Sequence, residues 1–189
     1  MLQSYAINMA VDKSKSDSVP DIDLAQLFQE HYPRIYNYLR YRVNSVEDVE
    51  DLISTIFERA YTRREQFDST KGAFSTWLFG IAHNTLIDHY RKRKRRAAWE
   101  TDTELPADLV TPEASLETQV IEKEALVQVL RALDQLKERD QEIISLKFAG
   151  RLRNIEIGQI MEMKEKTVSV ALLRAVRRLR QEIDKEAAT

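Results

Sequence analysis

One predicted helix carries side chains whose combination is typical of nucleic-acid recognition. Within residues 74–96, a stripe at helical spacing joins an indole, an amide, a carboxylate and two guanidinium groups, on Trp77, Asn84, Asp88, Arg91 and Arg95. Aromatic rings stack on bases, and amides form hydrogen bonds with base edges. The stripe therefore favours contact with nucleic acid; the alternative is an amphipathic core helix with a solvated basic end.

The two halves of this segment require different surroundings. The first half carries apolar side chains on the side away from the stripe: Phe74, Leu78, Ile81, Ala82 and Leu86. The second half ends in six consecutive basic residues, 91–96. The first half is expected to pack inward, whereas the positive charges of the second half attract a polyanion.

The composition predicts an all-α protein. The chain of 189 residues contains four glycines and four prolines, and no segment shows the alternation of a strand. Its hydrophobic content of 43% is enough for one domain or two small ones. The lack of cysteine excludes disulfides and thiolate metal sites and suits a reducing compartment. Because no signal-peptide pattern or apolar stretch of spanning length occurs, we expect a cytoplasmic protein without membrane insertion.

The sequence offers no motif for catalysis or cofactor binding. Its three histidines, His31, His83 and His89, include no pair at the spacing of one helical turn, so no helical metal site is expected. No glycine-rich phosphate loop or nucleophile motif occurs either. We therefore predict a protein that is not an enzyme and holds no metal or cofactor.

Charge is divided into opposed blocks, although the net charge is only −2. After the basic run at 91–96, residues 99–124 contain eight acidic residues and a single lysine. From residue 147 to residue 180, nine basic residues face three acidic ones. This pattern predicts two basic surfaces divided by an acidic segment.

The chain divides into four parts. Residues 1–20 are polar and aperiodic and are predicted to form a disordered tail. Residues 21–96 and 119–185 are predicted to form two helical domains, and the acidic, proline-containing residues 97–118 a flexible linker. Within the first domain, Pro33 is expected to kink or restart a helix.

The helix predicted after a Ser45 cap has two contrasting faces. Its inward face is apolar: Val49, Leu52, Ile53, Ile56 and Ala60. Its outer face carries Asp48, Asp51, Thr55 and Glu58. Spacing alone favours a solvated acidic face over a docking face for a basic protein. The polar loop 67–72 that follows is interpreted as a connection, although such a loop beside an aromatic ring can also hold an unstacked base.

The second domain ends in the pattern of a helix-turn-helix. A short helix over 143–148, stopped by Gly150, comes first. One apolar face then contains Ile157, Ile160 and Met161, and the next contains Val168, Leu172, Ala175, Val176 and Leu179. Gly158 would allow the two helices to approach closely, while Glu162 stands where the turn usually has glycine. The alternative is a helical hairpin with a basic solvated side.

Together these segments resemble the extracytoplasmic-function sigma factors, the compact branch of the bacterial sigma-70 family. Residues 74–95 read as that family's promoter-opening and minus-ten helix, FSTWLFGIAHNTLIDHYRKRKR. Residues 51–61, DLISTIFERAY, are similar to the segment that docks on the polymerase clamp, with Ser54 in place of the usual Gln. Residues 133–148 resemble the start of the fourth-region domain, with Lys137 where Pro is usual, and the helix-turn-helix resembles the minus-thirty-five reader.

The resemblance implies a transcription initiation factor that binds core RNA polymerase and promoter DNA and melts the minus-ten element, with an anti-sigma factor as a further partner. The implied polymerase contacts are Asp48, Asp51, Leu52, Ser54, Thr55, Phe57 and Glu58. The implied minus-ten contacts are Phe67, Ser69, Lys71, Trp77, Asn84, Asp88, Arg91, Lys92 and Arg95. The implied minus-thirty-five contacts are Lys164, Lys166, Thr167, Ser169, Arg174, Arg177 and Arg178.

Besides the Ser54 replacement, one further departure from the family pattern and two alternatives accompany this reading. Short side chains at Ser169, Val170 and Ala171 predict weak base reading at the minus-thirty-five element. A polymerase-independent helix-turn-helix regulator would explain the basic C-terminus but would leave the helix at 74–96 without a role. A structural or partner-binding helical protein, such as one that sequesters polymerase, predicts binding to polymerase without transcription.

Overall fold

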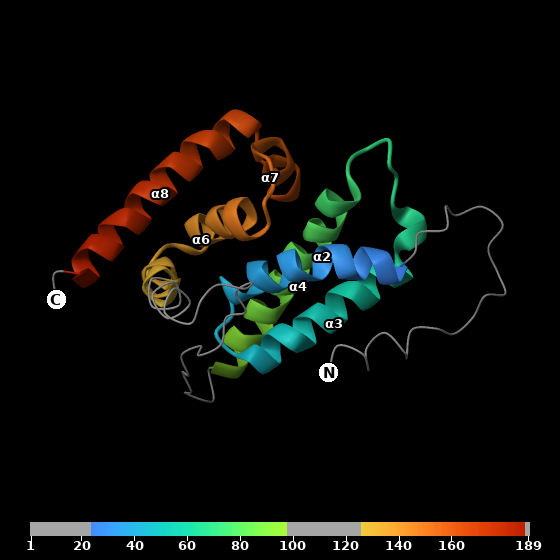
Figure 1. The fold of residues 1–189 in the computed structure, drawn as a ribbon, viewed down its shortest axis with the longest axis horizontal. Helices are drawn as coiled ribbons and strands as arrows, with labels where there is room; N and C mark the ends of the chain where they lie inside the picture. The colour runs from blue at the N-terminus through green and yellow to red at the C-terminus, as the bar shows by residue number, and fades with distance from the viewer. Residues whose placement is uncertain (1–23, 98–125, 188–189) are drawn as a thin grey trace, which may run out of the picture.

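The computed structural model describes residues 24–97 and 126–187, and these residues form helices without any strand. The predicted tail and nearly all of the predicted linker lie outside this part of the chain. The all-α prediction is confirmed for the described residues. Their elements are α2 (Leu24–Arg40), α3 (Val46–Thr62), the 3-10 turn η1 (Arg64–Gln66), α4 (Phe74–Ala97), a helix over residues 126–134, α6 (Glu138–Ile144), the π-helix η2 (Ser145–Ala149), α7 (Asn154–Ile160) and α8 (Glu165–Ala187) (Figure 1).

The first three long helices pack against one another as their apolar periodicity predicts. The five residues expected to face inward from α3 are all buried, and the side chain of Ser45 accepts a hydrogen bond from the Asp48 N–H, which caps that helix. α2 runs through Pro33 without restarting. Ile35, Tyr38 and Leu39, which follow the proline, are fully buried. Their packing offsets the backbone hydrogen bond that proline removes.

The helix-turn-helix closes as tightly as its glycine indicates. A Cβ atom on Gly158 would lie 2.5 Å from the backbone oxygen of Met163, so only glycine fits at this crossing. The Met163 N–H donates to the Gly158 carbonyl at 2.8 Å. Glu162, between them, takes a left-handed backbone conformation (φ 54°), which L-residues other than glycine adopt at a cost.

Two apolar side chains in the C-terminal half are more exposed than their periodicity indicates. The periodicity predicts Val176 on the inward face of α8, but it is 37% exposed, because it lies beside the packed stripe formed by Val168, Leu172, Ala175 and Leu179. Phe148 is 54% exposed. The π-helix bonds the Gly150 N–H to the Ser145 carbonyl, five residues back, and this wider turn buries Ala149 where an α-helix would have buried Phe148.

The two halves of the chain share one hydrophobic core. α7 packs on α4, and η2 packs on α2 (Figure 1). The buried cluster that contains Leu39 and Phe79 also contains Leu146, Leu152 and Ile157 from the second half. At the centre of this contact, a Cβ on Gly150 would lie 2.9 Å from the Phe79 ring, so the ring packs directly on the glycine backbone. The sequence predicts two domains, but its local patterns do not predict that the two pack together.

Candidate nucleic-acid interface

An aromatic cluster lies at the start of α4 and joins the two ends of the loop before it. Phe67 precedes the loop, and its ring lies 5.3 Å from that of Phe74 and 5.6 Å from that of Trp77, between centroids. Phe74 and Trp77 are in turn 5.3 Å apart. All three are half-buried, so each ring keeps an accessible part. Such rings can stack on an unpaired base.

The loop between Phe67 and Phe74 is ordered by its own side chains. The Asp68 carboxylate accepts hydrogen bonds from the N–H (3.0 Å) and the hydroxyl (2.6 Å) of Thr70. Lys71 lies 3.2 Å from the same carboxylate. These bonds to Thr70 and Lys71 lower the pKa of Asp68, so it is ionised at neutral pH. Ser69 and Lys71, two of the expected DNA contacts, are exposed on the outside of this turn.

The middle of the α4 stripe contains an exposed amide, that of Asn84, and an ion-paired carboxylate, that of Asp88. Asn84 is exposed, and its amide is available to a ligand. Asp88 lies 3.3 Å from the guanidinium of Arg59 on α3, which also donates to the Thr85 hydroxyl at 3.0 Å. The carboxylate of Asp88 therefore holds a cation beside the stripe and adds no isolated negative charge to it. Arg59 joins this surface although its partner is 29 residues away, and no local pattern in the sequence indicates it.

The end of α4 is a continuous positive surface. Residues 91–95 are all exposed, and they include the expected contacts Arg91, Lys92 and Arg95. They continue the helix that carries Phe74 and Trp77, so these two rings, the Asn84 amide and the cations lie along one helix, with Phe67 packed against its start. This arrangement suits a strand of nucleic acid that runs along α4, with its phosphates toward the helix end.

A second basic surface lies on α8 and the turn before it. All seven residues expected to contact DNA there are exposed: Lys164, Lys166, Thr167, Ser169, Arg174, Arg177 and Arg178. Arg178 is engaged, because its guanidinium lies 2.5 Å from the buried carboxylate of Asp140 and ties α8 to α6. The Ser169 hydroxyl accepts a hydrogen bond from the Asn154 amide at 2.9 Å.

Two apolar side chains interrupt this second surface. Val170 and Leu173 are 50% and 54% exposed, on the same side of α8 as Arg174 and Arg177. From the sequence, Val170 was interpreted only as a short side chain, and no role was predicted for Leu173. The sequence signal that could have indicated them is the spacing of three residues between two apolar side chains next to arginines. Apolar side chains in this position can contact thymine methyl groups.

The outer face of α3 is acidic and accessible. Asp51, Ser54 and Glu58 are exposed, while Asp48, Thr55 and Phe57 are half-buried. The hydroxyls of Ser54 and Thr55 donate to backbone carbonyls one turn earlier. Leu52 differs from the rest of the expected set, because it is buried in the core and supports the face from beneath.

The described residues contain neither a metal-binding cluster nor a membrane-spanning helix. Within residues 24–97 and 126–187, no group of three or more histidine, aspartate or glutamate side chains is arranged to hold a metal ion. Over the same ranges, none of the helices combines the length and apolarity that crossing a membrane requires.

Comparison with known proteins identifies both halves of the chain. Residues 27–96 match the family described as Sigma-70 region 2, and residues 126–179 match Sigma-70, region 4. The chain is 32% identical to the ECF RNA polymerase sigma factor BldN of Streptomyces coelicolor, over 82% of this chain and 58% of BldN. It is 27% identical to the ECF RNA polymerase sigma factor SigW of Bacillus subtilis, over 89% of this chain and 91% of SigW.

The fold is also found in a solved structure. A chain of the co-crystal structure of the sigma factor RpoE with the anti-sigma factor NepR from Bartonella quintana matches this structure with a TM-score of 0.71. The sequence identity is 21%, and the match covers 86% of this chain and 97% of that chain. At this identity the likeness concerns the fold alone.

Proposed function

This chain belongs to the extracytoplasmic-function branch of the sigma-70 family, and we propose that it initiates transcription by holding core RNA polymerase on α3 and promoter DNA on α4 and α8. The observation that carries the proposal is the single helix α4, on which the paired rings of Phe74 and Trp77, an exposed amide and an exposed basic end follow one another. The chain acts in the cytoplasm, where the polymerase is, and contributes no catalytic step. An anti-sigma protein is a further partner.

Melting of the minus-ten element is driven by differential binding. The cluster of Phe67, Phe74 and Trp77, with Asn84 farther along α4, offers an unpaired base stacking and an edge contact that paired DNA cannot use. Stacking on an aromatic ring contributes about 1–3 kcal/mol per base, and extruding a base costs a few kcal/mol. One or two captured bases therefore roughly balance the cost of opening, and polymerase supplies the remainder.

The other proposed contacts are with the polymerase, through α3, and with DNA phosphates, through α8. The acidic outer face of α3, with Asp51 and Glu58 exposed, is suited to a basic surface of the polymerase. On α8, the free cations Arg174 and Arg177 bind phosphates at the minus-thirty-five element, and the short side chains between them and the turn limit base reading.

Runoff transcription tests this function against its rivals. Purified core polymerase is incubated with and without this chain on a library of promoters. Specific transcripts only in the presence of the chain are the expected result. Tight promoter binding without polymerase would instead support an independent DNA-binding regulator, and polymerase binding without transcripts would support an inhibitory partner.

The role of the α4 stripe is tested by Asn84→Ala. We expect this variant to reduce opening of a duplex promoter more than binding to a promoter that is already melted, because the amide contacts a base only after separation. Gln128→Ala, which removes an exposed amide from another helix, is the matched control. Equal losses on the two templates would refute base capture by Asn84.

The role of the α3 face is tested by Asp51→Lys. Reversal of this exposed charge should weaken binding to core polymerase by about tenfold without changing helicity, since the side chain makes no core contact. Glu186→Lys, at the exposed far end of α8, controls for the change in net charge. An unchanged affinity of Asp51→Lys would show that the face is only solvated.

A further inference from the structure

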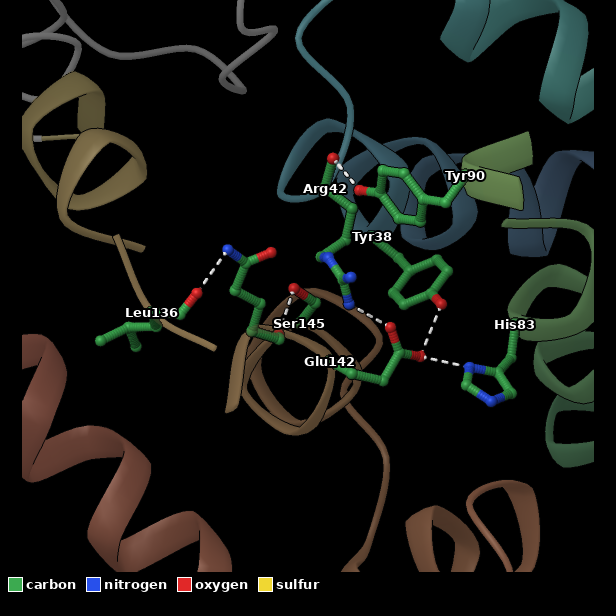
Figure 2. Close-up of polar contacts among 8 residues, drawn as sticks. Tyr38, Arg42, His83, Tyr90, Leu136, Glu142 and Ser145 are labelled. Atoms are coloured by element: carbon green, nitrogen blue, oxygen red, sulfur yellow. Dashed lines mark hydrogen bonds and ion pairs between the residues drawn. The ribbon is translucent and has the colours of Figure 1, made fainter. Parts of the chain in front are cut away.

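One carboxylate from the second half of the chain is buried among three polar groups from the first half. Glu142, in α6, accepts a hydrogen bond from the Tyr38 hydroxyl at 2.7 Å and is paired with the guanidinium of Arg42 (Figure 2). Nδ1 of His83 in α4 lies 2.7 Å from Oε1, the carboxylate oxygen that also accepts from Tyr38, while Arg42 pairs with Oε2. We call Tyr38, Arg42, His83 and Glu142 the interdomain cluster.

The interdomain cluster is almost closed to solvent. The side chains of Arg42 and Glu142 are 4% and 6% exposed, and Tyr38 is fully buried. Burial alone would raise the pKa of Glu142, but the His83 hydrogen bond and the Arg42 charge hold that pKa below its ordinary value. The carboxylate is therefore ionised. Removing one member of such a buried pair leaves the other charged and unpaired, which is strongly unfavourable.

The surrounding contacts join the same two halves. The guanidinium of Arg34 donates two hydrogen bonds to the Gly150 carbonyl, at 3.1 Å from Nε and 2.5 Å from Nη2. Phe79 packs on the same glycine. Arg34 lies outside the interdomain cluster, so the packed arrangement has two independent polar attachments.

This packed arrangement cannot reach both promoter elements at once. The minus-ten and minus-thirty-five elements are about 25 base pairs apart, which is roughly 85 Å along DNA at 3.4 Å per pair. A compact chain of this length has a radius of gyration of about 16 Å, so it is roughly 40 Å across. The 28 residues from 98 to 125 have a covalent reach of roughly 90 Å when extended, which is sufficient if the two halves separate.

We propose that the interdomain cluster, with Glu142 at its centre, is a lock that holds the free protein in a closed, promoter-incompetent state. Polymerase and promoter then engage only those molecules in which the two halves have separated. Free chains are thereby restrained from occupying promoter DNA with both surfaces. The consequence for promoters rests on the proposed function, whereas the lock itself is a property of the free chain.

The lock is tested by measuring the distance between the two halves in the full chain. The protein has no cysteine, so Glu30→Cys in α2 and Gln159→Cys in α7 allow specific spin labelling of two exposed positions. These positions lie on opposite sides of the contact, because Glu30 is one turn before Arg34 in α2, whereas Gln159 is in α7, which packs on α4. Electron paramagnetic resonance should give one short distance in the wild type and a second, much longer one on opening.

Glu142→Gln should raise the ratio of open to closed molecules by about 100-fold, because Arg42 loses its buried counter-charge. Arg34→Ala, the independent variant, should raise it by about tenfold. Glu138→Gln, an exposed position on the same helix, should leave it unchanged. Circular dichroism checks that each variant retains wild-type helicity. Unaltered short distances in both Glu142→Gln and Arg34→Ala, or long distances already dominant in the wild type, would overturn the proposal.

Transcription at limiting protein provides the second readout. Glu142→Gln should reach half-maximal transcription at a lower concentration than the wild type, an increase in function that simple destabilisation would not produce. If Glu142→Gln is open but reaches half-maximal transcription at the same protein concentration as the wild type, the closed state does not restrain promoter binding. If no variant supports transcription, the proposed function fails, while the distances still decide whether the cluster is a lock.

Discussion

The same substitution at two helical glycines should change stability in opposite directions. Gly80 lies inside α4, and a Cβ there would have no atom within 4 Å. Gly158 lies inside α7, where a Cβ would be 2.5 Å from the Met163 carbonyl oxygen, closer than real Cβ atoms approach other atoms. Neither residue has a positive φ, so backbone strain does not distinguish them. The difference between the two sites is therefore steric.

The magnitudes follow from these surroundings. Gly80→Ala gains the helix propensity of alanine, about 1 kcal/mol, without a clash. Gly158→Ala gains part of that amount but forces a backbone shift, for which overpacking costs typically about 1–3 kcal/mol. We expect a net loss of about 1–2 kcal/mol. For a chain of this size, 1 kcal/mol changes Tm by about 2–4 °C, so Gly80→Ala should raise Tm by that amount and Gly158→Ala should lower it by about 2–8 °C.

Thermal unfolding followed by far-ultraviolet circular dichroism measures both shifts in parallel. Because Gly158→Ala should displace the helix-turn-helix, it should also weaken binding to the minus-thirty-five element. Gly80→Ala should leave that binding unchanged. If both variants shift Tm in the same direction, the contact at Gly158 does not set its stability, and the close crossing of α7 and α8 is not required.

Three further predictions concern backbone strain, acid pH and salt. Glu162→Gly should raise Tm by about 2–4 °C, because glycine relieves the left-handed strain of roughly 1 kcal/mol; an unchanged Tm would mean that the turn is unstrained. The pKa of Glu142 is lowered by folding, so its contribution to stability is present at neutral pH and lost as the pH falls through the folded pKa, below about 4.5. Wild-type Tm should therefore fall more steeply in acid than that of Glu142→Gln, and parallel profiles would contradict this. Arg91→Ala and Arg95→Ala should each reduce the slope of log K against log salt, for promoter binding by the polymerase complex, by about one; an unaltered slope would remove those residues from the phosphate contacts.

Features that depend on residues close together in the chain could be predicted from residue type and spacing. The inward face of α3 and the Ser45 cap follow from spacing and side-chain type alone, and all of those residues are where the pattern predicts. The close crossing at Gly158 followed in the same way, since only a residue without a Cβ allows it. The roles assigned to residues on α4 and α8 stay predictions, although their exposure is compatible with them.

Contacts between distant residues could not be predicted by the same reasoning. Glu142 lies 104 residues from Tyr38 and 59 from His83, and no periodicity relates them. The exposure of Phe148 depends on one widened helical turn, which residue types at 145–149 do not distinguish from an α-helix. Asp88 was assigned to the DNA stripe by spacing, and its partner Arg59 belongs to another helix. These features depend on how the helices pack, which composition does not encode.

The absence of a side chain at Gly150 serves two structural purposes, one within its own half of the chain and one at the contact between the halves. An added methyl group would lie 2.7 Å from the Leu146 carbonyl oxygen in η2, the helix that Gly150 follows, and 2.9 Å from the Phe79 ring across the contact. The end of η2 and the docking of the two halves therefore both require a residue without a Cβ at position 150. A substitution there would disturb both at once. A genetic selection for constitutively active chains should recover Glu142 substitutions with near-normal abundance, whereas changes at Gly150 should be depleted or accompanied by suppressors.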